Sequence, residues 1–179
     1  MDFTEKTISG ERIYSGKVIN VDVEEVGLPN GKTSKRELVR HPGAVAVIAV
    51  TKENNIVMVR QYRKALEKEI LEIPAGKMEA GEEPHVTAGR ELEEETGYKP
   101  LALKKIASFY TAPGFCDELV HLYEADIDKP GRPFTDEDEF VQVEEISLQE
   151  AEEAVQQNLI HDAKTMYAVQ YLRLRINEQ

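Results

Sequence analysis

Cysteine is almost absent from this chain of 179 residues, which contains Cys116 alone. A single thiol cannot form an intrachain disulfide, and we therefore expect a protein of a reducing compartment, the cytoplasm. Long apolar stretches are also missing, since the longest, Gly43 to Val50, is far too short to span a bilayer. The first twelve residues, MDFTEKTISGER, hold no apolar segment of the kind found in a signal peptide.

Basic residues are fewer than acidic residues in this chain. The chain has 22 Lys and Arg against 34 Asp and Glu, a net charge of −12. Such a surface repels phosphate backbones and anionic lipids, which argues against general binding to nucleic acids or membranes. If the ligand is itself an anion, cations must be recruited locally to hold it.

The periodicity of apolar residues predicts a mixture of strands and helices, without repeats. Strands are expected at residues 11–26, 33–40, 44–50, 56–63, 101–110, 118–127 and 141–147. Helices are expected at residues 84–96, 148–158 and 163–175, and an ordered loop at 72–82. The pattern predicts an α/β (α+β) sandwich with a mixed sheet. Residues 1–40 are expected to form an N-terminal antiparallel hairpin or sheet around the turn Pro29-Asn30-Gly31, and residues 41–179 the main domain.

Glutamate is concentrated in the stretch RELEEETG, residues 90–97, near the end of the first predicted helix. Glu91 and Glu95 are four residues apart and share one helix face, where like charges destabilise the helix. The end of a helix also carries partial negative charge, which favours Lys or Arg. Two interpretations follow: a charged, exposed helix, or a site for a hard divalent cation such as Mg²⁺ or Mn²⁺.

The spacing around this helix resembles the Nudix box, in which glycine, glutamate and arginine recur at fixed offsets over 23 residues. All seven fixed positions match, and only Tyr98 departs, where an aliphatic residue is usual. The matching residues are Gly76, Glu82, Arg90, Glu91, Glu94, Glu95 and Gly97. The resemblance implies an α/β/α sandwich that hydrolyses a nucleoside diphosphate linked to another group.

The same resemblance implies roles for the residues of the box. Glu91 and Glu95 would bind Mg²⁺, or Mn²⁺ as a substitute, with Glu94 as a nearby or shared ligand. The backbone carbonyl of Ala75 would be a further ligand. Glu82 would brace the loop, and Arg90 would neutralise and orient the carboxylates.

A proline sixteen residues after Gly97, Pro113, is similar to the pattern of the ADP-ribose pyrophosphatase branch of the family, as are the stretches RELVRHPGAVAV and VRQYR. This likeness implies a set of substrate-binding residues: Lys17, Val18, Arg36, Glu37, Arg63, Ala112, Pro113, Gly114 and Glu118. It also implies a homodimer in which the N-terminal sheet is exchanged between subunits. Tyr14, Tyr110 and Phe115 are candidates for stacking on adenine.

A general base must be sought outside the box, whose glutamates are assigned to the metal. The acidic loop TDEDEF offers Glu137 and Glu139, two residues apart. By similarity we assign Glu137 as the base and Glu139 as a further metal ligand, with the reverse assignment left open.

The resemblance therefore implies Mg²⁺-dependent hydrolysis of ADP-ribose to AMP and ribose 5-phosphate. Two alternatives are a Nudix hydrolase for another nucleoside diphosphate derivative, such as a different nucleotide sugar or NADH, and a sensor that binds ADP-ribose without cleaving it.

Overall fold

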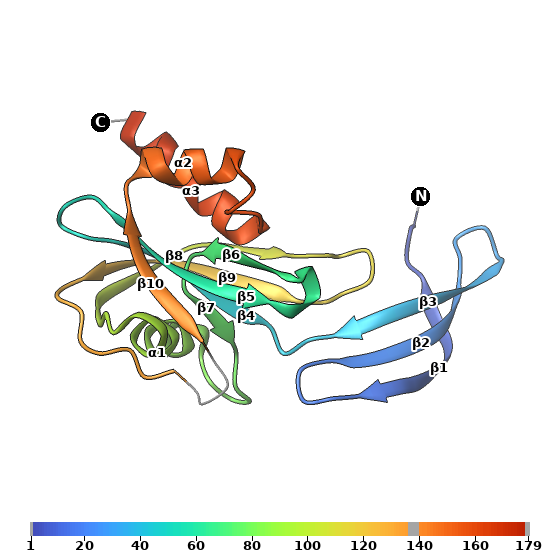
Figure 1. Ribbon diagram of the computed structural model, residues 1–179. Coiled ribbons are helices and arrows are strands. Elements are labelled where there is room, and N and C mark those ends of the chain that lie inside the picture. The colour runs from blue at the N-terminus through green and yellow to red at the C-terminus, as the bar shows by residue number, and fades with distance from the viewer. Residues whose placement is uncertain (1, 136–139, 178–179) are drawn as a thin grey trace. The chain divides into compact units, whose positions relative to one another are not determined.

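Two separate sheets organise the computed structural model, which describes residues 2–135 and 140–177 (Figure 1). The chain divides into two compact units. The first unit comprises residues 1–43 and 109–119, and the second comprises residues 44–108 and 120–179. None of the helices among the described residues is long and apolar enough to cross a membrane.

The first unit is built on a three-stranded antiparallel sheet in the order β1-β2-β3. Its strands are β1 (Lys6–Ser15), β2 (Asn20–Gly27) and β3 (Thr33–Arg40). The predicted hairpin between the last two is confirmed, with Gly31 at a φ of 81° in its turn. The single strand predicted at residues 11–26 is wrong, because the chain turns at residues 16–19, where the amide of Gly16 donates to the carbonyl of Ile19 at 2.9 Å.

The second unit is an α/β/α sandwich around a seven-stranded mixed sheet, as predicted. Its central path runs β10-β5-β4-β9-β8, with β6 beside β5 and β7 beside β4. The strands are β4 (Ala44–Val50), β5 (Ile56–Arg63), β6 (Lys68–Glu72), β7 (Ala75–Lys77), β8 (Pro100–Tyr110), β9 (Leu119–Ile127) and β10 (Val141–Ile146). A 3₁₀ turn, η1 (Lys64–Leu66), joins β5 to β6. The sheet is mixed because β4 pairs parallel with β9 and antiparallel with β5 and β7.

Helices cover both faces of this sheet: α1 (Pro84–Thr96) lies on one, and α2 (Leu148–Gln156) and α3 (Ala163–Asn177) lie on the other (Figure 1). Strand β4 is buried on both sides, as its continuous apolar sequence predicts, since Ala46, Val47 and Ile48 are all 0% exposed. Val45 and Val47 pack in one cluster with Leu92 of α1.

Strands β6 and β7 correct the sequence prediction, which left residues 64–71 unassigned and placed an ordered loop at 72–82. Residues Ala75–Lys77 contain a glycine and are too few to signal a strand by themselves. They become one because Val45 of β4 pairs with Gly76. Tertiary pairing overrides local preference here.

Helix α1 begins at Pro84 and ends at Thr96, with Gly97 just past its end, as the sequence predicts. Gly97 has a φ of 75°, and its amide donates to the carbonyl of Glu93 at 2.8 Å. Its carbonyl in turn accepts from the amide of Gly131 at 2.7 Å. A Cβ at this position would lie 2.8 Å from backbone atoms of Gly131. The helix end therefore requires glycine for two reasons, its conformation and this close approach.

We expect Gly97→Ala to lower the free energy of unfolding by more than Gly81→Ala does. Both positions have positive φ, and Gly81 has nothing within 4 Å of its ideal Cβ. The left-handed conformation costs about 1–2 kcal/mol at either site, and the backbone clash adds about 1–3 kcal/mol at Gly97 alone. Urea unfolding of the two variants measures the difference. Equal losses would show that the contact with Gly131 carries no stability.

Candidate functional site

Arg90 lies at the centre of the acidic end of α1 and contacts three carboxylates. Its guanidinium donates to Glu82 (Nη2–Oε2, 3.1 Å), to Glu91 (Nη1–Oε1, 3.0 Å) and to Glu94 (Nη1–Oε2, 2.8 Å). The hydrogen bond to Glu82, with the charges of Glu91 and Glu94, raises the pKa of Arg90, and the same bond lowers the pKa of Glu82. A permanent cation therefore offsets the repulsion between these glutamates.

Glu82 joins the loop before α1 to the helix itself. Its Oε2 also accepts a hydrogen bond from the hydroxyl of Thr87 at 2.8 Å, and the buried Thr87 is one turn into α1. The side chain thus connects the start of the helix to the guanidinium near its end.

Gly76 leaves room for the carboxylate of Glu91. An ideal Cβ on Gly76 would lie 1.9 Å from Cδ of Glu91. Two non-bonded carbon atoms cannot approach so closely, and the Glu91 side chain or the backbone would have to move. Glu91 is only 9% exposed, so its carboxylate has little freedom to move elsewhere. This glycine is therefore required by close packing against the acid.

Glu95 is the most buried carboxylate of the cluster, at 1% exposed. Its Oε2 accepts a hydrogen bond from the amide of Ala75 at 3.0 Å. This bond brings the side chain of Glu95 to the short strand β7, beside the residue whose carbonyl is expected to bind metal. Burial of a charged carboxylate is costly unless it is paired or hydrogen-bonded, and this amide supplies one partner.

The donor set fits a hard divalent cation. Glu91, Glu94 and Glu95 offer carboxylate oxygens within one helical turn and a half, and the space left by Gly76 brings the carboxylate of Glu91 against β7. In residues 2–135 and 140–177, no three acidic, histidine or cysteine side chains already converge closely enough to hold an ion. Arg90 instead bridges the carboxylates there. Glu137 and Glu139, the predicted base and further metal ligand, lie outside the described residues.

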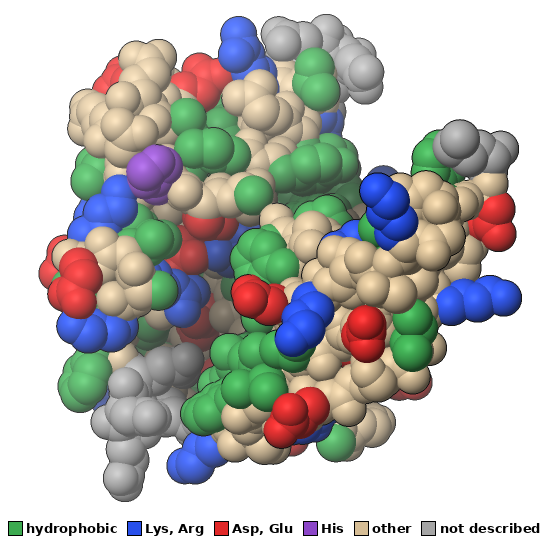
Figure 2. Space-filling view, turned by 90° about the vertical axis from the view of Figure 1, so that its right-hand side faces the viewer, with side chains coloured by type: hydrophobic (Ala, Val, Ile, Leu, Met, Phe, Trp, Pro, Cys, Tyr) green, Lys and Arg blue, Asp and Glu red, His purple; other side chains and the backbone are tan. Residues whose placement is uncertain are grey.

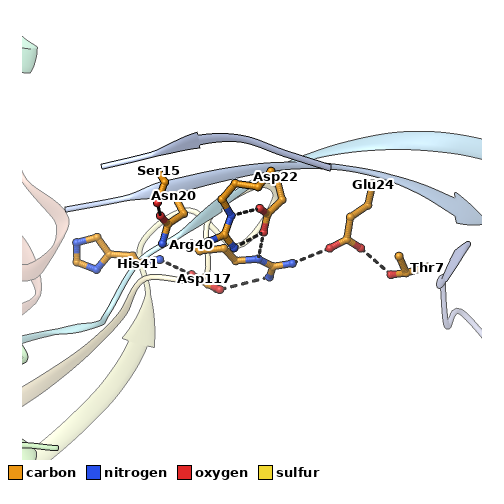
Figure 3. Close-up of polar contacts among 9 residues, drawn as sticks. Thr7, Ser15, Asn20, Asp22, Glu24, Arg40, His41 and Asp117 are labelled. Atoms are coloured by element: carbon orange, nitrogen blue, oxygen red, sulfur yellow. Dashed lines mark hydrogen bonds and ion pairs between the residues drawn. The ribbon is translucent and has the colours of Figure 1, made fainter. Parts of the chain in front are cut away.

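The loop at residues 111–118, which includes Pro113, belongs with the N-terminal sheet. The amide of Val39 on β3 donates to the carbonyl of Phe115 at 2.7 Å, and the amide of Asp117 donates to the carbonyl of Val39 at 3.2 Å. The carboxylate of Asp117 also accepts from the amide of His41 at 2.8 Å and from Arg40 at 3.3 Å (Figure 3). The loop and the sheet thus form one structural unit.

Arg40 is the hub of the polar network in Figure 3. Besides Asp117, it donates to Asp22 at 3.2 Å and to Glu24 at 2.9 Å, both on β2. Arg12 of β1 donates to the other oxygen of Asp22 at 2.6 Å. Three strands and the loop are therefore connected through two arginines, which compensates for the weakness of each exposed ion pair taken alone.

The structure places the predicted substrate-binding residues in both units. All but one lie in the first unit: Lys17, Val18, Arg36, Glu37, Ala112, Pro113, Gly114 and Glu118. Lys17 and Val18 are exposed in the turn between β1 and β2. Glu118 accepts from the hydroxyl of Thr111 at 2.6 Å and lies 3.7 Å from Nε2 of His41.

Arg36 and Glu37 are brought to opposite faces of the N-terminal sheet, because they are neighbours on β3. Arg36 is engaged by both carboxylate oxygens of Glu5, at 2.6 and 2.8 Å. Glu37 is exposed. Since their side chains diverge, a ligand lying on one face of the sheet meets only one of them directly.

Arg63 lies in the second unit, at the end of β5. Its Nε donates to Oε2 of Glu72 at 2.6 Å, and the side chain is still 39% exposed. The guanidinium is therefore anchored at one nitrogen and open to solvent elsewhere.

Comparison with known proteins agrees with this geometry. The family model described as the NUDIX domain matches residues 40–169. The chain belongs to the NUDIX family. The resemblance of residues 76–98 to the Nudix box is thereby confirmed at the level of the family, whose members generally use divalent metal ions.

Several relatives of this NUDIX protein are similar over nearly its whole length. An ADP-ribose pyrophosphatase of Bacillus subtilis (strain 168) is 59% identical over 96% of the chain and 94% of that protein. A methanol dehydrogenase activator of Bacillus methanolicus is 58% identical over 97% of the chain and 95% of that protein. A crystal structure of an ADP compounds hydrolase superposes with a TM-score of 0.84, covering 98% of the chain and 95% of its own, at 19% identity. The last likeness shows the fold alone.

Two charged residues near the Nudix box escaped the sequence analysis, Glu72 and Lys164. Glu72 is the last residue of β6, directly after the buried Ile70 and Leu71, and is only 2% exposed. A charge that follows two apolar residues just before the box was the available signal. Lys164 is far away in the sequence, and only the fold brings it to Glu72.

We expect Gly76→Ala to weaken the binding of a divalent cation by about 10–100-fold, a range typical of disturbed ligand support. The added methyl group displaces the carboxylate of Glu91, whose Cδ lies where the new atom must go. Titration with Mn²⁺, followed by electron paramagnetic resonance of the free ion, measures the affinity.

Gly89→Ala is the matched control for this variant, because it adds the same methyl group inside α1. Its Cβ would make ordinary contacts with Pro100 and Leu103, at 3.5 and 3.8 Å. Alanine is also favoured in a helix interior. The control should bind Mn²⁺ as the parent does, and an unchanged affinity in Gly76→Ala would contradict the role given to Glu91.

Proposed function

We propose that this NUDIX protein hydrolyses the diphosphate of ADP-ribose to AMP and ribose 5-phosphate, with Mg²⁺ as its cation. The observation that carries the proposal is the acidic end of α1, where Glu91 and Glu94 contact Arg90 and Glu95 accepts from the amide of Ala75, in the setting of the matched Nudix box. The near full-length similarity to an ADP-ribose pyrophosphatase supports the choice of substrate.

The net charge of −12 explains why a cation is needed for this substrate. Carboxylates alone would repel a diphosphate, whereas divalent cations held by them neutralise and polarise it when bound. Ala75, Glu91, Glu94 and Glu95 are the ligands that we assign among the described residues, and Glu139 is a fifth. Arg63 supplies a fixed positive charge in the same unit.

The reaction consumes one water molecule. Glu137 takes a proton from this water, whose oxygen forms a bond to one phosphorus as the bond from that phosphorus to the bridging oxygen breaks. The bridging oxygen leaves with the second phosphate group. Residues of the first unit (Lys17, Val18, Arg36, Glu37, Ala112, Pro113, Gly114 and Glu118) are assigned to recognition of the remainder of ADP-ribose.

Incubation with a panel of nucleoside diphosphate derivatives and Mg²⁺ tests the proposal. ADP-ribose, other nucleotide sugars and NADH are supplied separately, and phosphate is measured after a phosphatase has been added to cleave the products. We expect the highest kcat/KM with ADP-ribose and no turnover after EDTA. A higher kcat/KM with another compound would assign a different substrate, and tight binding of ADP-ribose without turnover would indicate a sensor.

A second function is favoured by one relative. The chain is 58% identical to a methanol dehydrogenase activator, close to its 59% identity to the pyrophosphatase. Activation of a dehydrogenase is therefore a second candidate. Adding the protein to a methanol dehydrogenase, with and without Mg²⁺, and measuring the rate of alcohol oxidation tests this candidate separately.

We also propose that the protein is a cytoplasmic homodimer in which the N-terminal sheet is exchanged. All ten residues of β1 are exposed in the isolated chain, including the apolar Ile8 and Ile13. The side of the molecule shown in Figure 2 presents apolar side chains next to acidic and basic ones. Light scattering at micromolar concentration should give the mass of a dimer, and the mass of a monomer would contradict the exchange.

We expect Glu137→Gln to lower kcat by about 10²–10⁴-fold, the usual contribution of a general base. Glu93→Gln is the matched control, since Glu93 fills the unconstrained position of the box and pairs with Lys99 at 3.1 Å. Steady-state kinetics on ADP-ribose should leave the control near the parent value. Near-full turnover in Glu137→Gln would remove this residue from the mechanism, and Glu139→Gln would then be measured as the alternative base.

A further inference from the structure

Glu72 is a buried carboxylate held by two cations. It ends β6 and is 2% exposed. Its Oε2 accepts from Nε of Arg63 at 2.6 Å, and its Oε1 accepts from the ammonium group of Lys164 at the start of α3. A carboxylate in such a place is costly unless both of its oxygens are satisfied, and here each oxygen meets a full positive charge.

Lys164 is held in turn by Asp162. The ammonium group donates to Oδ1 of Asp162 at 2.9 Å, and the same oxygen accepts from the amide of Thr165 at 3.0 Å, so that it caps the first turn of α3. The two carboxylates and two cations balance in charge. Lys164 is 15% exposed, which makes it a partly buried lysine rather than a fully solvated one.

Arg63 is the more exposed of the two cations, since its side chain is 39% exposed and that of Lys164 is 15% exposed. The side chain of Glu72, which lies between them, is 3% exposed. Among the described residues, Arg63 makes its hydrogen bond through Nε. The opposite edge of a guanidinium carries one N–H group on each terminal nitrogen, and this edge is not the one that meets Glu72. A planar guanidinium anchored in this way can offer both terminal N–H groups to one phosphate.

The same turn of α3 also fixes the chain between Glu72 and the Nudix box. The hydroxyl of the buried Thr165 accepts from the amide of Ile73 at 3.1 Å. The carbonyl of Pro74 accepts from the amide of Val47 at 2.9 Å, and the amide of Ala75 donates to Glu95 at 3.0 Å. The support for Arg63 is therefore continuous with the support for the proposed metal ligands.

We propose that Glu72, backed by Lys164, is a positioning residue that orients Arg63 to bind a phosphate group of the substrate. This inference rests on the proposed function for the identity of the ligand. Glu72 acts through Arg63 and has no contact with substrate of its own, and Lys164 holds the buried carboxylate in place.

A double-mutant cycle on KM tests the proposal. Arg63→Ala should raise KM for ADP-ribose by about 10–100-fold, as expected for the loss of a charged hydrogen bond. Glu72→Gln should raise KM by about 5–20-fold with kcat within about threefold, because a neutral amide holds the guanidinium less firmly. In the Arg63→Ala background, Glu72→Gln should have less than about a twofold effect.

Matched variants separate positioning from general stability. Glu69→Gln removes an exposed carboxylate from the same strand and should leave KM unchanged. Lys164→Arg keeps the charge opposite Glu72 and should stay closer to the parent KM than Lys164→Met does. Thermal unfolding of each variant shows whether its fold is intact. If Glu72→Gln does not fold, the cycle is made with Lys164→Met and Arg63→Ala instead.

Binding of ADP in the presence of Mg²⁺, measured by calorimetry, gives a readout that requires no turnover. The affinity for ADP should fall in the order of the variants in which KM rises. Equal effects of Glu72→Gln with and without Arg63, or an unchanged KM in Arg63→Ala, would overturn the proposal. If the parent enzyme prefers another compound in the panel, the proposed function fails, and the cycle is run on that compound. The coupling between Glu72 and Arg63 then still decides this inference.

Discussion

The burial of carboxylates in an acidic protein is the constraint on which the second unit depends. Glu72, Glu91 and Glu95 are each at most 9% exposed in a chain of net charge −12. Each carboxylate must find a cation or an amide when it leaves water. Their partners come from β5, β7, α1 and α3, so that satisfying these charges fixes how the helices and loops meet the sheet.

The same constraint makes the acidic end of α1 suitable for a cation. Four glutamates near the end of a helix, without a basic residue in its last turn, would be unfavourable in isolation. Arg90 offsets part of the repulsion, and a divalent cation would offset more. Burial of apolar side chains in the sheet, where β4 is covered on both faces, offsets the instability of this site.

The two units divide the proposed roles between them. Among the described residues, the ligands that we assign to the metal lie in the second unit, on α1 and β7. The residues assigned to recognition of ADP-ribose lie mostly in the first unit, where Arg40 and Asp117 connect the Pro113 loop to the N-terminal sheet. Changes of substrate among relatives can therefore arise in one unit while the chemistry is kept in the other.

The sequence by itself determined the sandwich, the limits of α1 and the identity of its acidic residues, because these depend on local periodicity and on fixed spacing. Strand β7 could not be read locally, since its partner β4 lies far earlier in the sequence. The turn after Ser15 and strand β6 belong to hairpins with nearby partners, Asn20 for Ser15 and Arg63 for Lys68, and the apolar periodicity alone did not show them. The attachment of the loop at residues 111–118 to β3, and the contact of Lys164 with Glu72 across 92 positions, were decided only by the tertiary structure. A buried charge pairs with a group that lies close to it in space, and no local pattern in the sequence shows which group that is.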